Sequence, residues 1–141
     1  MSDVDRFRVL DAATLVSGQI GPSDMAALKA RGVAMIVNNR PDREEPGQPS
    51  GADIEAAALA AGIGYRHVPV DNAGLSPDRI AAMAEAIEAS GGRMLAFCRS
   101  GTRSTYLWAL ARARAGEDAG ELIAKAAAAG YDISPIRPHL R

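Results

Sequence analysis

Short hydrophobic runs alternate with longer segments of mixed polarity along the chain. The runs at 33–37 and 93–97 are almost continuously apolar and have strand length, which is typical of strands buried in a parallel sheet. A third strand is predicted at 65–70, and two short strands at 7–10 and 13–19 are expected at an edge of the sheet. Because segments of helix length separate the later strands, we expect most strands to run parallel.

Helices are predicted between these strands because glycine, proline and serine mark their ends. Gly21-Pro22-Ser23-Asp24 begins one helix and Gly32 ends it, and Ser76-Pro77 begins another. The predicted helices cover residues 21–31, 52–61, 76–89, 104–115 and 117–129. We therefore expect one three-layer α/β domain over residues 1–141, with a core at about 7–130 and a tail at 131–141. Helices should flank a central, mostly parallel sheet of about four or five strands.

Length and composition agree with one domain and limit its partners. With 141 residues, 48% of them hydrophobic, the chain can bury a single core. Its net charge of −1 gives no general attraction to nucleic acid or an anionic membrane, so anion binding must be local. The polar start at residues 1–6 does not resemble a signal peptide, and no apolar run is long enough for a membrane span. We expect a cytoplasmic protein without metal or cofactor, whose single cysteine excludes an internal disulfide.

That cysteine lies in the most informative segment, Cys98-Arg99-Ser100-Gly101-Thr102-Arg103-Ser104, directly after the strand predicted at 93–97. Ligands of open α/β sheets bind beyond the carboxyl ends of the strands. The N–H groups of a glycine-containing loop, the positive end of the next helix and two guanidinium groups all favour negative charge at one point. The segment therefore predicts a reactive thiolate beside a site for a small anionic substrate.

Several segments together resemble known cysteine-dependent enzymes. The loop at 98–104, with the segments 32–42 and 67–71 before it, resembles the phosphate loop and preceding strands of the dual-specificity branch of protein tyrosine phosphatases. More narrowly, the loop and residues 38–49 are similar to the phosphatase-like domain of bacterial beta-lactamase-hydrolase-like proteins. The resemblance covers about residues 7–130 and implies a cysteine-phosphatase-like α/β fold.

The loop departs from that superfamily in its spacing. Only four residues lie between Cys98 and Arg103, namely Arg99, Ser100, Gly101 and Thr102. The phosphatases have five residues at this place. The four-residue spacing resembles the active loop of rhodaneses, which transfer sulfur instead of phosphate. A tetrahedral phosphoryl group needs a wider ring of N–H donors than one sulfur atom does, so a smaller ring favours a persulfide. Phe97 also stands where most tyrosine phosphatases have a histidine.

From the spacing we favour a rhodanese-type sulfurtransferase. The Cys98 thiolate would attack thiosulfate or a persulfide, and Arg99 and Arg103 would hold the donor's anionic end. The loop residues Ser100, Gly101 and Thr102 would bind the sulfur through their amides, and Ser104 and Arg40 would support the anion site. Arg40 and Asp42 follow the strand at 33–37, so they could line the cleft or form a solvated turn.

Two alternatives stay open. In a phosphatase, Cys98 would form a phosphocysteine, Arg103 would hold the phosphoryl oxygens, and Asp71, 27 residues before the cysteine, would protonate the leaving group. Asp71 could instead begin a turn at 71–74, and Asp78 is a second choice of acid. In a non-catalytic anion-binding or protein-binding domain, the long loop at 38–50 or the tail at 133–141 would contact the partner.

Overall fold

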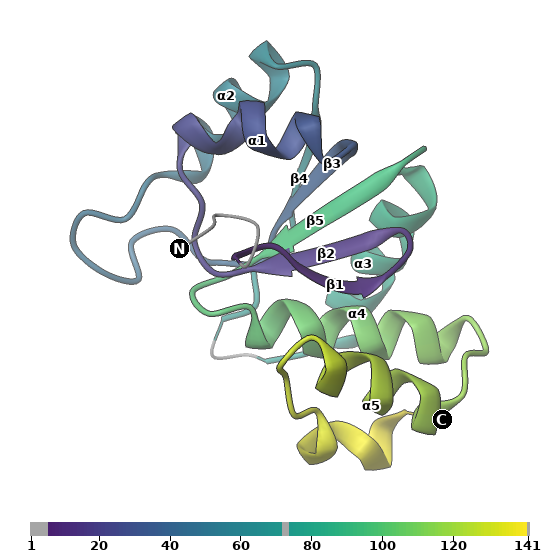
Figure 1. Ribbon diagram of the computed structural model, residues 1–141. Helices are drawn as coiled ribbons and strands as arrows, with labels where there is room; N and C mark the ends of the chain where they lie inside the picture. The colour runs from purple at the N-terminus through teal and green to yellow at the C-terminus, as the bar shows by residue number, and fades with distance from the viewer. Residues whose placement is uncertain (1–5, 72–73, 141) are drawn as a thin grey trace.

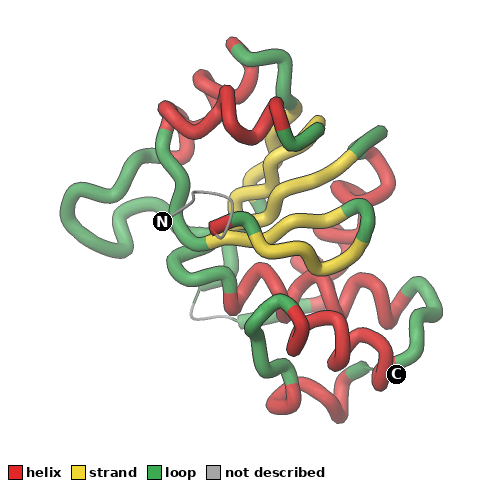
Figure 2. The backbone as a smooth tube through the Cα atoms, in the orientation of Figure 1, coloured by secondary structure: helices red, strands yellow, loops and turns green. Residues whose placement is uncertain are grey.

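The computed structural model describes residues 6–71 and 74–140, which form a five-stranded sheet between two layers of helices (Figures 1 and 2). The strands are β1 (Arg8–Asp11), β2 (Thr14–Ser17), β3 (Val33–Asn38), β4 (Gly64–His67) and β5 (Arg93–Phe97), in the order β1-β2-β5-β3-β4. β1 pairs with β2 in antiparallel fashion, and the remaining pairs are parallel. The predicted mostly parallel α/β sheet is confirmed, with β5 at its centre.

The helices begin close to where the capping residues predict them. They are α1 (Met25–Ala30), which follows a 3₁₀ helix at Pro22–Asp24, then α2 (Gly51–Ala60), α3 (Pro77–Ala89), α4 (Thr102–Arg114) and α5 (Ala119–Ala128). A last 3₁₀ helix covers Ser134–His139. The side chains of Ser50, Ser76 and Asp118 each accept a hydrogen bond from the backbone N–H three residues later, which satisfies a helix N–H that has no partner within the helix.

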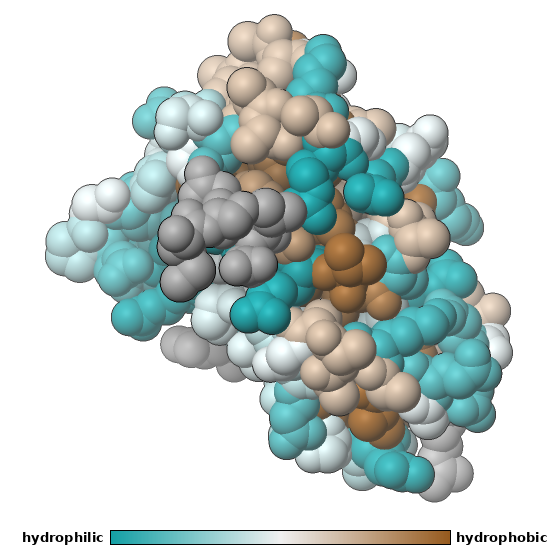
Figure 3. Space-filling view, in the orientation of Figure 1, coloured by the Kyte–Doolittle hydropathy of each residue, from teal (hydrophilic) through white to brown (hydrophobic). Residues whose placement is uncertain are grey.

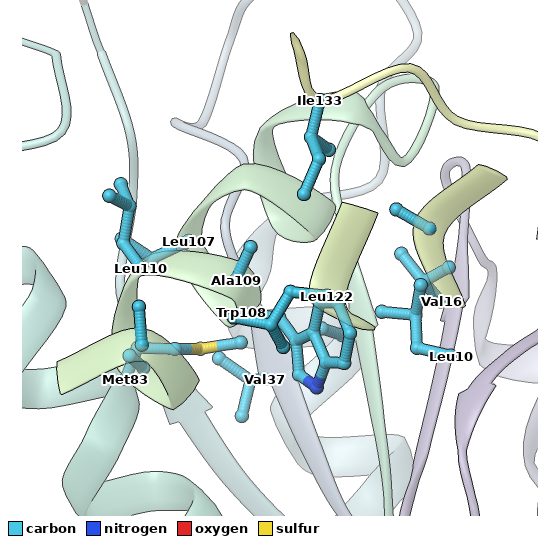
Figure 4. Packing of buried hydrophobic residues seen from close by; sticks show 14 of the residues in the cluster. Leu10, Val16, Val37, Met83, Leu107, Trp108, Ala109, Leu110, Leu122 and Ile133 are labelled. Atoms are coloured by element: carbon cyan, nitrogen blue, oxygen red, sulfur yellow. The ribbon is translucent and has the colours of Figure 1, made fainter. Parts of the chain in front are cut away.

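Alternate side chains of β5 enter two separate hydrophobic clusters. Leu95 and Phe97 pack with the residues of α1 and α2 on one face of the sheet. Met94 and Ala96 pack on the other face, where α3, α4 and α5 surround the fully buried Trp108 (Figure 4). This alternation along a strand explains why β5 reads as a continuous apolar run, because both of its faces are covered.

The carboxyl-terminal segment packs back onto the second of these clusters. Ile133, Ile136 and Leu140 are all buried there, beside α4 and α5. The segment predicted as a tail therefore contributes to the core. On the face seen in Figure 3, strongly hydrophobic residues occupy only small separate areas. In the described ranges no helix has the length and hydrophobicity needed to cross a membrane.

The strand predicted at 65–70 is shorter in the structure, because Pro69 has no N–H to donate to a neighbouring strand. The chain nevertheless continues beside β3, since the N–H groups of Val68 and Val70 donate to the carbonyls of Asn38 and Asn39 at 2.9 Å each. This pairing carries the chain to Asp71 at the same end of the sheet as the cysteine. The polar start at 1–5, two residues of the turn expected at 71–74, and the last residue lie outside the described ranges.

Candidate active site

Cys98 follows the carboxyl end of the central strand, as predicted. Its backbone N–H lies 3.4 Å from the carbonyl of Ser17 at the end of β2, and its side chain is fully buried. The loop after Cys98 leads directly into α4, whose first turn contains Arg103. In Figure 1 this loop and the long loop at 39–50 lie at the same end of the sheet.

Three successive carbonyl groups of the cysteine loop accept hydrogen bonds from other parts of the chain. The carbonyl of Arg99 accepts from the N–H of Gln19 at 3.4 Å, and that of Ser100 accepts from the hydroxyl of Tyr131 at 3.0 Å. The carbonyl of Gly101 accepts from both the N–H and the hydroxyl of Thr105, at 2.9 and 2.8 Å. The C=O and N–H of a trans peptide point in opposite directions, so a held carbonyl also sets the direction of the next N–H. The N–H of Gly101 donates to Cys98 Sγ at 3.1 Å. The loop thus points a backbone donor at the sulfur.

Two glycines allow this loop its conformation and its close packing. Gly101 has φ 97°, which only glycine adopts readily, and a Cβ there would lie 2.1 Å from the Tyr131 hydroxyl oxygen. At Gly18, a Cβ would lie 2.8 Å from the carbonyl oxygen of Arg99. A larger residue at Gly18 would push against the backbone of the loop, and one at Gly101 would be strained and would collide with the Tyr131 side chain.

Arg103 is oriented by two acceptors, Glu44 and Val70, and lies near the Cys98 side chain. Its Nη1 and Nη2 donate to the two carboxylate oxygens of Glu44 at 2.7 and 2.8 Å, and Nη1 also donates to Val70 O at 2.9 Å. These bonds use three of the five N–H groups of an arginine. The two others, on Nε and Nη2, lie side by side on one edge, which suits two oxygens of an oxyanion.

The charges of this pair perturb each other. The hydrogen bond that Arg103 donates to the Glu44 carboxylate is the largest cause that raises the pKa of Arg103, and the neighbouring Cys98 side chain adds to it against the effect of burial. In return, the hydrogen bond from Arg103 lowers the pKa of Glu44 from 4.5 to about 2, and Arg40 contributes in the same direction. Glu44 is therefore ionised throughout the physiological pH range.

The long loop at 39–50 is held together by internal hydrogen bonds that place Glu44. Arg40 has only 1% of its side chain exposed, and it donates to Glu44 and Glu45 at 2.8 Å each and to Gln19 at 2.9 Å. Gln48 bonds to the backbone of Glu44 and of Pro41, at 2.9 Å each, which closes the loop on itself. The loop thus holds Glu44 in position to accept the hydrogen bonds from Arg103.

Glu44 was not predicted as a site residue, and it enters the sequence-based predictions only within the segment at 38–49 that resembles the family. One signal was available, because five charged residues crowd the segment at 40–45 while two arginines occupy the cysteine loop. A local backbone feature marks the same place, since Arg43 has φ 62°, the left-handed conformation that non-glycine residues rarely adopt. This turn directs the next residue, Glu44, toward Arg103.

The structure brings Asp71 and Arg103 to the same pocket. This pocket has a volume of about 310 Å³ and is lined by Pro41, Glu44, Val70, Asp71 and Arg103. The turn expected after Asp71 is consistent with the bond from Gly74 N–H to the Asp71 carbonyl, at 2.9 Å. A carboxyl group and a guanidinium group thus line one space beside the cysteine loop.

The remaining predicted residues occupy different positions around the loop. Arg99 is 67% exposed and lies 3.9 Å from Glu45, so its charge faces solvent near the loop. Ser100 and Thr102 bond to each other through their hydroxyls at 3.1 Å. Ser104 is fully buried, and its hydroxyl has no hydrogen-bond partner among the described residues. Arg40 supports the site from behind Glu44 and does not line the pocket shared by Asp71 and Arg103. Within residues 6–71 and 74–140, no three His, Cys, Asp or Glu side chains are placed to hold a metal ion.

The fold is that of the cysteine-phosphatase class, with Cys98 in the loop after the central strand, and comparison with solved structures agrees. A candidate phosphatase from Neisseria meningitidis Z2491 superposes with a TM-score of 0.84, at 33% identity and over 96% of both chains. TpbA from Pseudomonas aeruginosa, whose structure was solved with phosphotyrosine, superposes with a TM-score of 0.70 at 15% identity, over 100% of this chain and 86% of that one. The second likeness concerns the fold alone.

Sequence comparison identifies the family. The profile of the phosphatase-like domain of beta-lactamase hydrolase-like proteins matches residues 6–115, so the chain belongs to this family. The beta-lactamase hydrolase-like protein of Xylella fastidiosa (strain Temecula1) is 37% identical over 84% of the chain, and that of Agrobacterium fabrum is 37% identical over 72%. The matches span only 28% and 23% of those relatives. The family expected from the sequence is confirmed.

Proposed function

We propose that this chain is a cysteine-dependent phosphatase that hydrolyses small phosphate monoesters through a phosphocysteine at Cys98. The observation that carries the proposal is the shared pocket of Asp71 and Arg103, next to a loop that aims a backbone donor at a buried thiol. The relatives support this hypothesis better than the sulfur transfer favoured from the loop spacing, because the family is described as phosphatase-like and the Neisseria structure, at 33% identity, is a candidate phosphatase.

Each group has a defined task in the first step. The Nε edge of Arg103 binds two phosphoryl oxygens, while the Cys98 thiolate, which accepts from the N–H of Gly101, attacks phosphorus on the side opposite the leaving oxygen. The S–P bond forms as the P–O bond breaks, and Asp71 gives its proton to the departing oxygen. The negative charge on the non-bridging phosphoryl oxygens is the same before and after this step, and the guanidinium group of Arg103 partly offsets it.

The second step restores the enzyme. Water attacks the phosphocysteine, the ionised Asp71 accepts a proton from that water, and the S–P bond breaks to release inorganic phosphate. The sulfur leaves as a thiolate, which the N–H of Gly101 stabilises.

Sulfur transfer is the second candidate, and the four-residue spacing between Cys98 and Arg103 favours it. The thiolate would attack the outer sulfur of thiosulfate, forming an S–S bond and releasing sulfite. Sulfite is a stable anion that leaves without a proton, so this reaction does not need Asp71. The requirement for an acid therefore distinguishes the two chemistries.

Two reactions of the reduced chain test the proposal directly. Phosphate release from an aryl phosphate should occur in the wild type, fall about a hundredfold or more in Asp71→Asn, and vanish in Cys98→Ser. Intact mass after exposure to thiosulfate should show no added sulfur. Asp53→Asn on the exposed surface of α2 serves as the matched control, and Asp78→Asn tests the second choice of acid.

The outcomes separate the hypotheses. Sulfur added to Cys98, without phosphate release and without any effect of Asp71→Asn, would refute the phosphatase and establish sulfur transfer. Phosphate release that is lost in Asp78→Asn and kept in Asp71→Asn would reassign the acid. No reaction with either compound would favour an anion-binding domain.

A further inference from the structure

Tyr131 reaches the cysteine loop from the far end of the chain. It follows α5 and Gly130, whose φ of 97° turns the chain, and its N–H donates to the carbonyl of Ala126 at 2.9 Å. This closure of the helix end fixes the backbone of Tyr131. The side chain then extends to the loop, where its hydroxyl donates to the carbonyl of Ser100 at 3.0 Å.

The bonded carbonyl belongs to the same peptide group as the donor that faces the sulfur. The Ser100 carbonyl and the Gly101 N–H are the two ends of one planar unit, and they point in opposite directions. Tyr131 binds one end, and Cys98 Sγ accepts from the other at 3.1 Å. A rotation of this peptide would break both bonds and would turn a carbonyl oxygen toward the sulfur, which would disfavour a thiolate.

We propose that Tyr131 is a positioning residue for the Cys98 nucleophile, which it controls through the peptide between Ser100 and Gly101. Its hydroxyl holds that peptide with the N–H toward Cys98 Sγ, and the hydrogen bond to the carbonyl polarises the same amide into a stronger donor. The proposal rests on Cys98 as the nucleophile and applies to either transferred group, phosphoryl or sulfur.

The close packing at Gly101 supports this role. The Tyr131 hydroxyl occupies the space where any side chain at position 101 would begin, at 2.1 Å from the Cβ position. Burial is the first cause that raises the pKa of Tyr131, and the charge of Cys98 adds to it. The phenol therefore stays protonated and keeps its O–H as the donor when Cys98 is ionised. The charge of Arg8 acts in the opposite direction and lowers the pKa of Tyr131. The charged residues of the cysteine loop itself are Arg103, paired with Glu44, and the exposed Arg99.

Tyr131→Phe tests the proposal, because it removes the hydroxyl and keeps the ring. Selective ¹³C labelling of cysteine produces a single Cβ resonance, since the chain has one cysteine, and its pH titration reports the thiol-to-thiolate change. We expect the midpoint to rise by about half to one pH unit in Tyr131→Phe, which is about three- to tenfold less thiolate at a given pH below it. The Gly101 amide resonance should also move and exchange faster with solvent.

Tyr106→Phe is the matched control, since Tyr106 is a partly buried tyrosine on α4 that packs against the core. It should leave the Cys98 midpoint and the Gly101 amide unchanged. A lower melting temperature in Tyr131→Phe with both Cys98 and Gly101 signals unchanged would overturn the proposal and leave a purely structural tyrosine. These readouts need no turnover, so they decide the role of Tyr131 even if the chain releases no phosphate.

Discussion

Arg40 and Arg103 share the carboxylate of Glu44 and yet have opposite uses. Arg40 is almost fully buried, and each nitrogen of its guanidinium group donates to an acceptor from the chain itself, namely Gln19, Glu44 or Glu45. Arg103 is partly exposed, and its bonds to Glu44 and Val70 leave the Nε edge for a ligand. The comparison teaches that the number of acceptors already present decides whether an arginine is fully used within the fold or keeps N–H groups for the ligand that we propose.

Among the substitutions that test this comparison of the two arginines, Arg103→Lys should have the largest effect on activity. An ammonium group keeps the positive charge but cannot bind Glu44 and two substrate oxygens with fixed geometry. We expect turnover of an aryl phosphate to fall about a hundred- to a thousandfold, while the melting temperature changes little. Steady-state kinetics and thermal unfolding measure the two quantities. Near-normal turnover would show that charge alone, and not the guanidinium edge, serves the site.

Arg40→Met should instead act mainly on stability. The substitution fills most of the buried space but removes the hydrogen bonds to Gln19, Glu44 and Glu45, so the loop at 39–50 loses its anchor. We expect the free energy of unfolding to fall by about 2–3 kcal/mol, with a smaller loss of activity than in Arg103→Lys. Urea denaturation measures the free energy of unfolding, and phosphate release from an aryl phosphate measures the activity. A stable but inactive Arg40→Met protein would reverse the roles assigned to the two arginines.

The smallest effect is a pH dependence of stability that comes from Glu44. The pKa of this carboxyl in the folded chain is about 2, below its ordinary 4.5, so the unfolded chain binds the proton more tightly. Its stabilising contribution is therefore complete above about pH 4.5 and is lost as the pH falls toward 2. Thermal unfolding from pH 7 to pH 2 should show a shallower decline in Glu44→Gln than in the wild type. Parallel curves for both proteins would contradict this.

Local sequence patterns were enough to predict the α/β sheet, the five helices and the position of Cys98 at a strand end. The apolar runs, the serine caps and the glycine stops act over a few residues, and the structure confirms the elements that they predict. The strand expected at 65–70 is shorter, because Pro69 interrupts its hydrogen bonding. The loop spacing between Cys98 and Arg103 favoured sulfur transfer, whereas the relatives of the whole domain support a phosphatase better.

The partners of the cysteine loop could not be predicted in the same way. Glu44 and Arg103 are 59 residues apart in the chain, and Tyr131 and Ser100 are 31 apart. An acidic loop residue and a tyrosine after a helix have many possible neighbours, and only the packing of the complete domain selects one. The long loop at 38–50, which the sequence offered as a possible contact for a partner, is tied instead to distant residues of its own chain, since Arg40 donates to Gln19 and Glu44 accepts from Arg103.

The sequence by itself determined where Cys98 and Arg103, the proposed nucleophile and oxyanion-binding residue, lie at the end of a buried strand, because this depends on residues adjacent in the chain. Only the tertiary structure decided what orients them. Glu44 directs the free edge of Arg103, and Tyr131 holds the peptide whose N–H faces Cys98, because packing brings distant side chains within hydrogen-bond distance. A thiolate site therefore depends on local sequence for its reactive groups and on the whole fold for their direction.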